Sequence, residues 1–98
     1  GMVIDMYVIL VYDIVMDKQG AKVSRHVFKI CKKYLTHVQN SVFEGELTKS
    51  QLESLKNELD RWIRQNVDSV IIFKNRNKDW LDKEFMGQNL TDLTSDIF

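Results

Sequence analysis

The stretch from Met6 to Tyr12, MYVILVY, decides the fold, because it is the longest apolar run in the chain. Seven residues are too few for a typical helix, and three of them are β-branched, so the run predicts a strand. A strand with apolar side chains on both of its faces is expected to lie in the centre of its sheet, with both faces covered. The run stops at Asp13, and a polar loop containing Gly20 follows.

Two later segments have apolar residues at helical spacing. The first extends from about Lys22 to Leu35, and its inner stripe consists of Val23, Val27, Ile30, Cys31 and Tyr34. The second opens at Thr48-Lys49-Ser50-Gln51, which has the form of a capping box, and is expected to fade near Asn66. Its apolar face consists of Leu52, Leu55, Leu59, Trp62 and Ile63. Both segments are therefore predicted to be helices that pack one face on a sheet.

The remaining strand signals complete the order of elements. His37 to Leu47 is strand-like on both sides of Asn40-Ser41, which predicts a tight hairpin. Ser69 to Phe73, SVIIF, is the next strand. The order strand, helix, strand, strand, helix, strand predicts an α+β, ferredoxin-like (βαββαβ) fold, in which two helices cover one face of an antiparallel four-stranded sheet. Residues 1–98 are expected to form a single domain, with a core of about 6–74 and a C-terminal extension of 75–98.

The uncovered face of such a sheet predicts a homodimer, since a second copy would bury it. The C-terminal extension contains too much apolar surface for a free tail: Trp80-Leu81, Phe85-Met86 and Ile97-Phe98. We expect a short helical turn near Trp80 and an extra strand near the C-terminus, docked on its own or a partner's sheet edge.

Composition excludes several classes of protein. The chain has 98 residues, of which 44% are hydrophobic and 29% charged, as expected of a globular domain and not of a disordered segment. Its longest apolar run is far below the ~18 residues of a membrane span, so no membrane partner is expected. Asp5 interrupts the apolar N-terminal stretch, which argues against a secretory signal. A single cysteine, Cys31, fits a reducing compartment and predicts a cytoplasmic protein.

The charges are balanced in number but not in position. Fourteen basic and fourteen acidic residues give zero net charge, which by itself argues against a nucleic-acid-binding protein. The segment from Lys18 to His37, however, has no acidic residue. Four of its basic residues recur on one helical face, and we call them the basic stripe: Lys22, Arg25, Lys29 and Lys32. The basic stripe predicts sequence-independent contacts with the phosphates of RNA or DNA, and the alternative is an ordinary solvated face.

Two blocks of sequence resemble a known family. MYVILVYDI places an aromatic residue and an aspartate at the end of the first strand, and KYLTHVQNSVFEGEL joins the first helix to the hairpin. Together with DSVIIFK, they make the chain similar, from about Met6 to Phe73, to the CRISPR-associated endoribonucleases of the adaptation module, the second Cas family (Cas-two). The most specific part is QNSVFEG. The resemblance implies a ferredoxin-like homodimer that joins a CRISPR-associated integrase subunit in capturing spacer DNA.

The resemblance also implies metal-dependent endonuclease activity and names candidate residues for it. Asp13 is the catalytic and metal-binding candidate, Arg25 matches a basic position of the family, and Tyr12, Ser41 and Phe43 lie near the site. A carboxylate where a chain leaves its sheet suits magnesium, which prefers oxygen ligands, and two-fold symmetry would pair two copies of Asp13. The alternatives are a loop cap or a polar dimer contact for Asp13, core packing for Tyr12 and Phe43, and a turn position for Ser41.

The sequence leaves three functions open. The first is a magnesium-dependent endonuclease that hydrolyses phosphodiester bonds of RNA or DNA. The second is a purely architectural, non-catalytic subunit that bridges the CRISPR integrase on DNA. The third is a regulatory ferredoxin-like module that binds a small ligand or peptide. His26 and His37 lack companions at zinc-ligand spacing, and Cys31 lies on the apolar stripe, so all three are expected to be structural.

Overall fold

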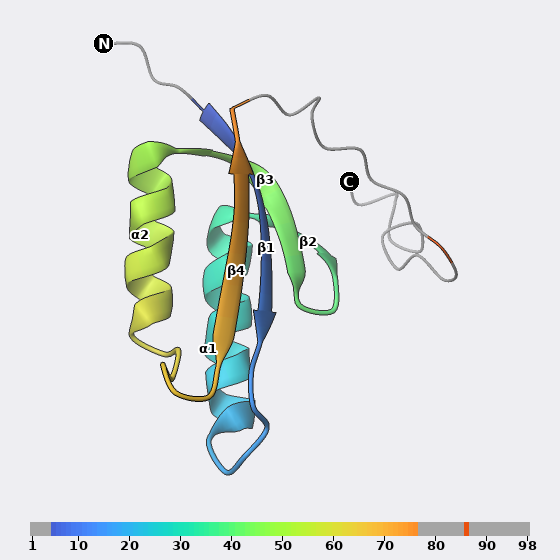
Figure 1. The fold of residues 1–98 in the computed structure, drawn as a ribbon, viewed down its shortest axis with the longest axis vertical. Coiled ribbons are helices and arrows are strands. Elements are labelled where there is room, and N and C mark those ends of the chain that lie inside the picture. The colour runs from blue at the N-terminus through green and yellow to red at the C-terminus, as the bar shows by residue number, and fades with distance from the viewer. Residues whose placement is uncertain (1–4, 77–85, 87–98) are drawn as a thin grey trace.

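The computed structural model describes residues 5–76 and Met86. Its six elements follow the predicted order (Figure 1): β1 (Asp5–Asp13), α1 (Gly20–Tyr34), β2 (Thr36–Gln39), β3 (Val42–Thr48), α2 (Lys49–Asp60) and β4 (Ser69–Asn75). The strands lie in the order β2-β3-β1-β4, and every neighbouring pair is antiparallel. The predicted α+β class, with a four-stranded antiparallel sheet and two helices, is confirmed.

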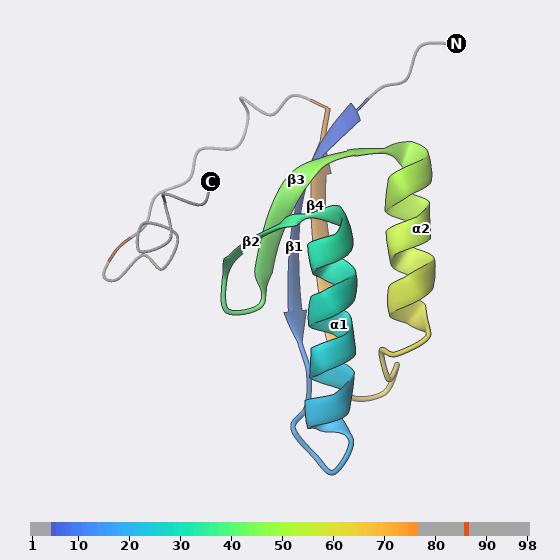
Figure 2. The same ribbon diagram turned by 180° about the vertical axis from the view of Figure 1, so that it is seen from behind.

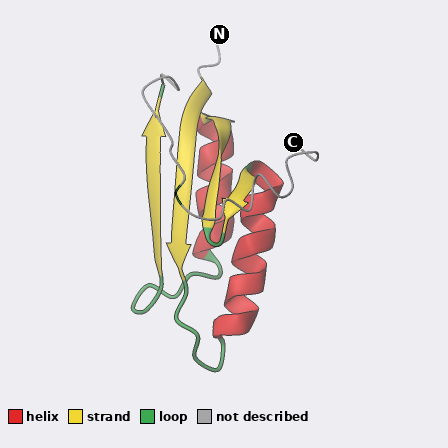
Figure 3. Cartoon of the chain, turned by 90° about the vertical axis from the view of Figure 1, so that its right-hand side faces the viewer, coloured by secondary structure: helices red, strands yellow, loops and turns green. Residues whose placement is uncertain are grey.

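Strand β1 lies between β3 and β4, as its apolar sequence predicts, and the helices cover only one of its faces (Figures 2 and 3). Val8, Leu10 and Tyr12 alternate along β1 and are buried beneath the helices. The intervening Ile9 and Val11 point to the opposite side and are only half-buried. Within one chain the helices form a single layer and bury one face of β1, so burial of the other face by a second copy stays a prediction.

Helix α1 begins at Gly20, two residues before the predicted start, and packs on the sheet through Val23, Val27 and Cys31. A Cβ atom at Gly20 would lie 2.3 Å from the carbonyl oxygen of Val15. Any larger residue would clash here, so glycine is what permits the close approach of the Val15 carbonyl to the first residue of α1.

The predicted hairpin is confirmed, with its turn at Asn40 and Ser41 between β2 and β3. Asn40 has a φ of 45°, in the left-handed region that asparagine tolerates better than most residues. His37 Nε2 forms a hydrogen bond of 2.8 Å with the carbonyl oxygen of Asn40 and so supports the turn.

The predicted capping box at the start of α2 is also confirmed. The hydroxyl of Thr48 accepts a bond of 3.1 Å from the Gln51 amide, and the Thr48 amide donates to Gln51 Oε1 at 2.9 Å. The helix ends at Asp60, however, and not near Asn66. Beyond it, the amides of Trp62 and Ile63 donate to the carbonyl oxygen of Leu59, and the amide of Arg64 donates to the carboxylate of Asp68.

Trp62 and Ile63 consequently follow the helix instead of lying within it, although both still pack against the core. The predicted helical turn near Trp80 and the extra C-terminal strand lie outside the described residues. Within residues 5–76, neither helix combines the length and apolar content that spanning a bilayer requires.

Candidate site at the end of the central strand

Asp13 is the last residue of β1 and is exposed. It pairs with Ser69, the first residue of β4. Because side chains alternate along a strand, Asp13 lies on the same face as Ile9 and Val11, away from the helices. The structure therefore places this carboxylate at one end of the uncovered side of the sheet.

We call this uncovered side the open face, and its apolar part lies along β1 and β4 next to Asp13. The strand registers place Ile9 level with Glu44 and Phe73, and Val11 level with Val42 and Ile71. Ile71 and Phe73 are each 52% exposed. Monomeric proteins rarely leave such residues side by side in water. An apolar surface thus leads along β1 to Asp13.

The other end of the open face has a polar pair. The hydroxyl of Tyr7 donates a hydrogen bond of 2.5 Å to Glu44 Oε2 across the β1–β3 pairing. The pKa of Tyr7 is raised above its ordinary value, mainly by partial burial and secondly by this hydrogen bond. Tyr7 therefore stays neutral and keeps its proton as a donor to Glu44.

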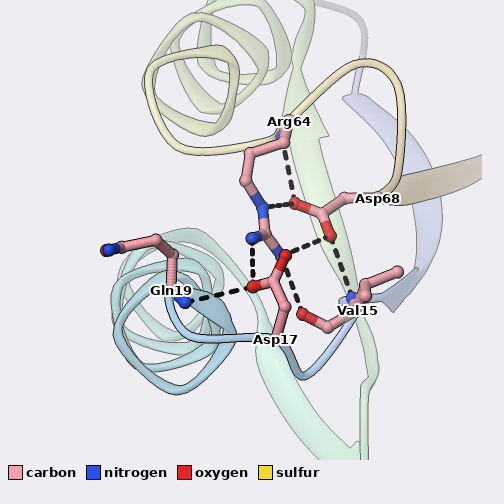
Figure 4. A network of polar contacts seen from close by, with 5 residues as sticks. All are labelled: Val15, Asp17, Gln19, Arg64 and Asp68. Atoms are coloured by element: carbon pink, nitrogen blue, oxygen red, sulfur yellow. Dashed lines mark hydrogen bonds and ion pairs between the residues drawn. The ribbon is translucent and has the colours of Figure 1, made fainter.

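Behind Asp13, the partly exposed Arg64 forms an ion pair with the buried Asp68 (Figure 4). Arg64 Nε donates to Asp68 Oδ2 at 2.9 Å and Nη2 to Asp68 Oδ1 at 3.0 Å, and the carboxylate has no exposed surface. The Arg64 guanidinium, opposed by partial desolvation, lowers the pKa of Asp68 to about 2. The pair is therefore fully charged at neutral pH.

The same pair holds the loop that follows β1. Arg64 Nη2 donates to the carbonyl oxygen of Val15 at 2.7 Å, and Nη1 donates to Asp17 Oδ1 at 2.5 Å. The amide of Val15 donates to Asp68 Oδ1 at 2.9 Å. We call the contacts among Val15, Asp17, Arg64 and Asp68 the Arg64 clamp. Sequence reasoning did not find it. Arg64 and Asp68 are only four positions apart, but Val15 and Asp17 lie about half of the chain away from them, and no local pattern links the two pairs.

Magnesium fits the chemistry of Asp13 but not the number of ligands in one chain. An exposed carboxylate is a suitable oxygen donor for this hard cation. Among residues 5–76 and Met86, however, no three His, Cys, Asp or Glu side chains gather closely enough to hold a metal ion. In a magnesium site that includes Asp13, the other ligands would be water molecules, phosphates of the substrate or a carboxylate of a second chain.

The basic stripe lies on the other side of the molecule. Its four residues are exposed on the surface of α1 that faces away from the sheet. Since the open face lies on the far side of that sheet, a single chain does not bring the basic stripe and Asp13 together (Figure 3). Lys22 Nζ lies 6.0 Å from the ring centroid of Trp62. The neighbouring Lys33 instead forms an ion pair of 2.5 Å with Glu58.

The three residues predicted near the site occupy different environments. The rings of Tyr12 and Phe43 are buried in the core and stack with centroids 6.1 Å apart. They lie beneath the helices, on the side of β1 opposite to Asp13. Ser41 is half-buried in the hairpin turn, where its carbonyl oxygen accepts a bond of 3.2 Å from the amide of Tyr12. Ser41 thus fixes the backbone next to Asp13.

The histidines and the cysteine have structural surroundings. His26 stacks on Trp62, and His37 packs against Phe28 and Phe43. Cys31 is fully buried, and burial raises the pKa of its thiol to about 12. A thiol that stays protonated is a poor nucleophile and metal ligand.

These features define a class of protein: a small α+β domain with helices on one face of its sheet and, on the other, an apolar surface with the exposed carboxylate of Asp13 at the end of the central strand. The comparison with protein families identifies it further. The model of the family described as CRISPR associated protein Cas2 matches residues 6–83. The chain belongs to the Cas2 family, as the sequence resemblance predicts.

Individual relatives agree with this assignment. The chain is 52% identical over 82 residues to a protein of Fusobacterium nucleatum named CRISPR-associated endoribonuclease Cas2, which covers 84% of this chain and 77% of the relative. A protein of the same name from Methanosarcina acetivorans is 37% identical over 94% of this chain and 99% of its own. Among solved structures, one titled as the crystal structure of cas2 superposes with a TM-score of 0.75 at 40% identity, covering 87% of this chain and 90% of the other.

A second solved structure, Cas2 of Streptococcus pyogenes at pH 6.5, has a TM-score of 0.70 at 31% identity. It covers 81% of this chain and 99% of the other. The similarity therefore extends over the β1–β4 core of the domain and includes the strand that carries Asp13.

Proposed function

We propose that this protein acts in CRISPR adaptation as a nucleic-acid-binding homodimer that cuts phosphodiester bonds of RNA or DNA with magnesium. Membership of the Cas2 family supports the proposal, because relatives 37–52% identical to this chain carry the name endoribonuclease. The strand order β2-β3-β1-β4 with both helices on one face supports a ferredoxin-like topology.

The open face supports the homodimer. Ile71 and Phe73 remain half exposed in one chain, and a second copy related by a two-fold axis would cover them with the same residues of its own surface. Asp13 lies on this face, so the two-fold axis brings its two copies to the same interface. A pair of carboxylates supplies the ligands that one chain lacks.

The position of Asp13 is the observation that carries the nuclease proposal. It is an exposed carboxylate at the edge of an apolar interface, held at the end of a central strand. When bound, magnesium would activate a water molecule and neutralise charge on the scissile phosphodiester. The two Asp13 carboxylates would hold the ion, and the basic stripe would hold phosphates of the same polynucleotide at a distance from the cut.

The rate at which the Asp13→Asn variant cleaves RNA or duplex DNA tests the proposal, and the Asp5→Asn variant is the control. Asp5 is an exposed aspartate on the same face of the same strand, at the opposite end. The wild-type dimer should cut RNA or duplex DNA with magnesium and lose this activity in EDTA. Asp13→Asn should cut at least ~100-fold more slowly, and Asp5→Asn should match the wild type. Cleavage by Asp13→Asn at the wild-type rate would refute the assignment and indicate a contaminating nuclease.

The alternative is an architectural subunit that bridges the integrase on DNA without cutting. The position of the basic stripe favours it, because nucleic acid bound along α1 lies across the sheet from Asp13. Spacer acquisition in cells separates the two functions. An architectural protein should support acquisition with Asp13→Asn, whereas loss of acquisition with DNA binding and assembly intact would exclude this function. A regulatory module without affinity for polynucleotides would instead leave duplex DNA unshifted at low salt.

A further inference from the structure

We propose that Arg64 and Asp68 are positioning residues, which fix the end of β1 so that Asp13 holds its carboxylate at one place on the open face. This inference rests on the proposed function of Asp13, since it assigns to the Arg64 clamp the task of ordering that site. The two residues lie behind Asp13 and are not themselves expected to touch substrate.

The backbone geometry gives the first argument. The ladder between β1 and β4 ends at the pair of Asp13 and Ser69. Just beyond it, the amide of Val15 donates to Asp68, and the carbonyl of Val15 accepts from Arg64. The side chains of Asp68 and Arg64 therefore supply the hydrogen bonds that a neighbouring strand would otherwise provide to the amide and the carbonyl of Val15. Asp68 directly precedes Ser69, so the clamp adjoins the strand end on both strands.

The loop itself has little other support. Among residues 14–19, only Ile14 is buried, and Val15 and Met16 are 43% and 67% exposed. Asp17 receives Arg64 Nη1 and also accepts a bond of 3.1 Å from the amide of Gln19. The amide of Gly20 also donates to the carbonyl oxygen of Asp17 at 3.1 Å. Since burial contributes little, we expect the charge-assisted hydrogen bonds of Arg64 to contribute most to the order of residues 15–17.

The requirement at the site gives the second argument. Asp13 is exposed at a strand terminus, where strands open most readily. Displacement of a reacting group by about 1 Å can lower a rate about 100-fold. In a symmetric dimer each chain supplies one Asp13, so a loose strand end would affect both halves of a shared site.

Asp68→Asn tests the inference, and Glu58→Gln is the matched control. Both replace a carboxylate that pairs with a cation, but Glu58 joins α1 to α2 through Lys33, away from Asp13. In Asp68→Asn, amide hydrogen exchange at Val15 should accelerate at least ~10-fold while exchange at Leu10 stays unchanged. The magnesium concentration for half-maximal cleavage should rise at least ~10-fold. Glu58→Gln should change neither quantity.

The two readouts separate this inference from the function on which it rests. A general loss of stability lowers the fraction of folded enzyme. It leaves unchanged the magnesium concentration at which the folded fraction reaches half-maximal cleavage, which we call the magnesium midpoint. If wild-type cleavage depends on Asp13 but Asp68→Asn keeps the wild-type midpoint, the inference is overturned and the function stands. If the wild type does not cleave, the function fails, and unchanged exchange at Val15 would overturn the inference independently.

A second variant covers the case in which Asp68→Asn does not fold. Arg64→Lys keeps the cation beside Asp68 but shortens its reach to Val15 and Asp17. It should show the same selective exchange at Val15 and the same rise in the magnesium midpoint. Wild-type values for both quantities would refute the proposal.

Discussion

The imidazole of His26 stacks on the indole of Trp62, with ring centroids 3.6 Å apart and ring planes within 7°. His26 belongs to α1, and Trp62 lies just after the end of α2. The stack therefore joins α1 to the segment that follows α2, and the ion pair of Lys33 with Glu58 joins α1 to α2 itself. Trp62 retains at this position the core contact that its sequence pattern predicts, although it lies outside the helix.

Trp62→Ala should lower the free energy of unfolding by about 2–3 kcal/mol, since it removes a partly buried aromatic ring and the stack with His26. Urea denaturation followed by circular dichroism measures the change. His26→Ala removes the stack but less apolar area, and should cost about 1 kcal/mol. A loss below about 0.5 kcal/mol for Trp62→Ala would show that the ring contributes little.

The stability difference between the wild type and Asp68→Asn should depend on pH. Arg64 lowers the pKa of Asp68 from 3.8 to about 2, and a depressed carboxyl pKa stabilises the fold above the unfolded value. About 2 kcal/mol should therefore be present above pH 4 and be lost as pH falls through about 2. Urea midpoints of both proteins across this range give the difference. A constant difference would contradict the assigned pKa.

Cys31 should be unreactive in the folded protein. Its thiol is fully buried, and its pKa is raised to about 12 by that burial, so the thiolate is scarce at pH 8. A chromogenic disulfide reagent should label Cys31 at least ~100-fold more slowly in buffer than in denaturant. Rapid labelling of the folded protein would place Cys31 outside the core.

Phe73→Glu should convert the proposed homodimer to a folded monomer. The substitution places a charge on β4 beside Ile9, within the apolar part of the open face, where a second copy would have to bury it. Asn57→Glu adds the same charge on an exposed position of α2 and should leave the dimer intact. Analytical ultracentrifugation reports the mass, and circular dichroism the fold. A stable Phe73→Glu dimer would assign the interface to another surface.

Lys29→Glu should weaken binding of duplex DNA at low salt by about 10-fold and reduce the dependence of log affinity on log salt concentration by about 1. Lys29 lies within the basic stripe, and its contact would release a counterion from phosphate. Lys49→Glu makes the same charge change at the first residue of α2, outside the stripe, and should leave the salt slope unchanged. If both variants lowered the affinity for DNA and the salt slope equally, the net charge of the protein, and not the basic stripe, would account for DNA binding.

The sequence by itself determined those features that depend on neighbours along the chain. The hairpin at Asn40 and Ser41 and the capping box at Thr48 and Gln51 are both present, because each motif is formed by residues a few positions apart. The apolar run of β1, which stops at Asp13, and the spacing of α1 likewise placed Asp13 at a strand end and the basic stripe on one face. The order of six elements follows from these local signals.

The tertiary structure alone decided which residues far apart in the sequence meet at the end of β1. Arg64 and Asp17 are 47 positions apart, and Val15 and Asp68 are 53 apart, so no periodicity links them. The buried carboxylate of Asp68 requires a cation and hydrogen-bond donors, and Arg64 and the amide of Val15 supply them, which ties the loop after β1 to the segment before β4. Packing of both helices on one face also separates Asp13 from the basic stripe, because a sheet with one covered side keeps its two surfaces apart.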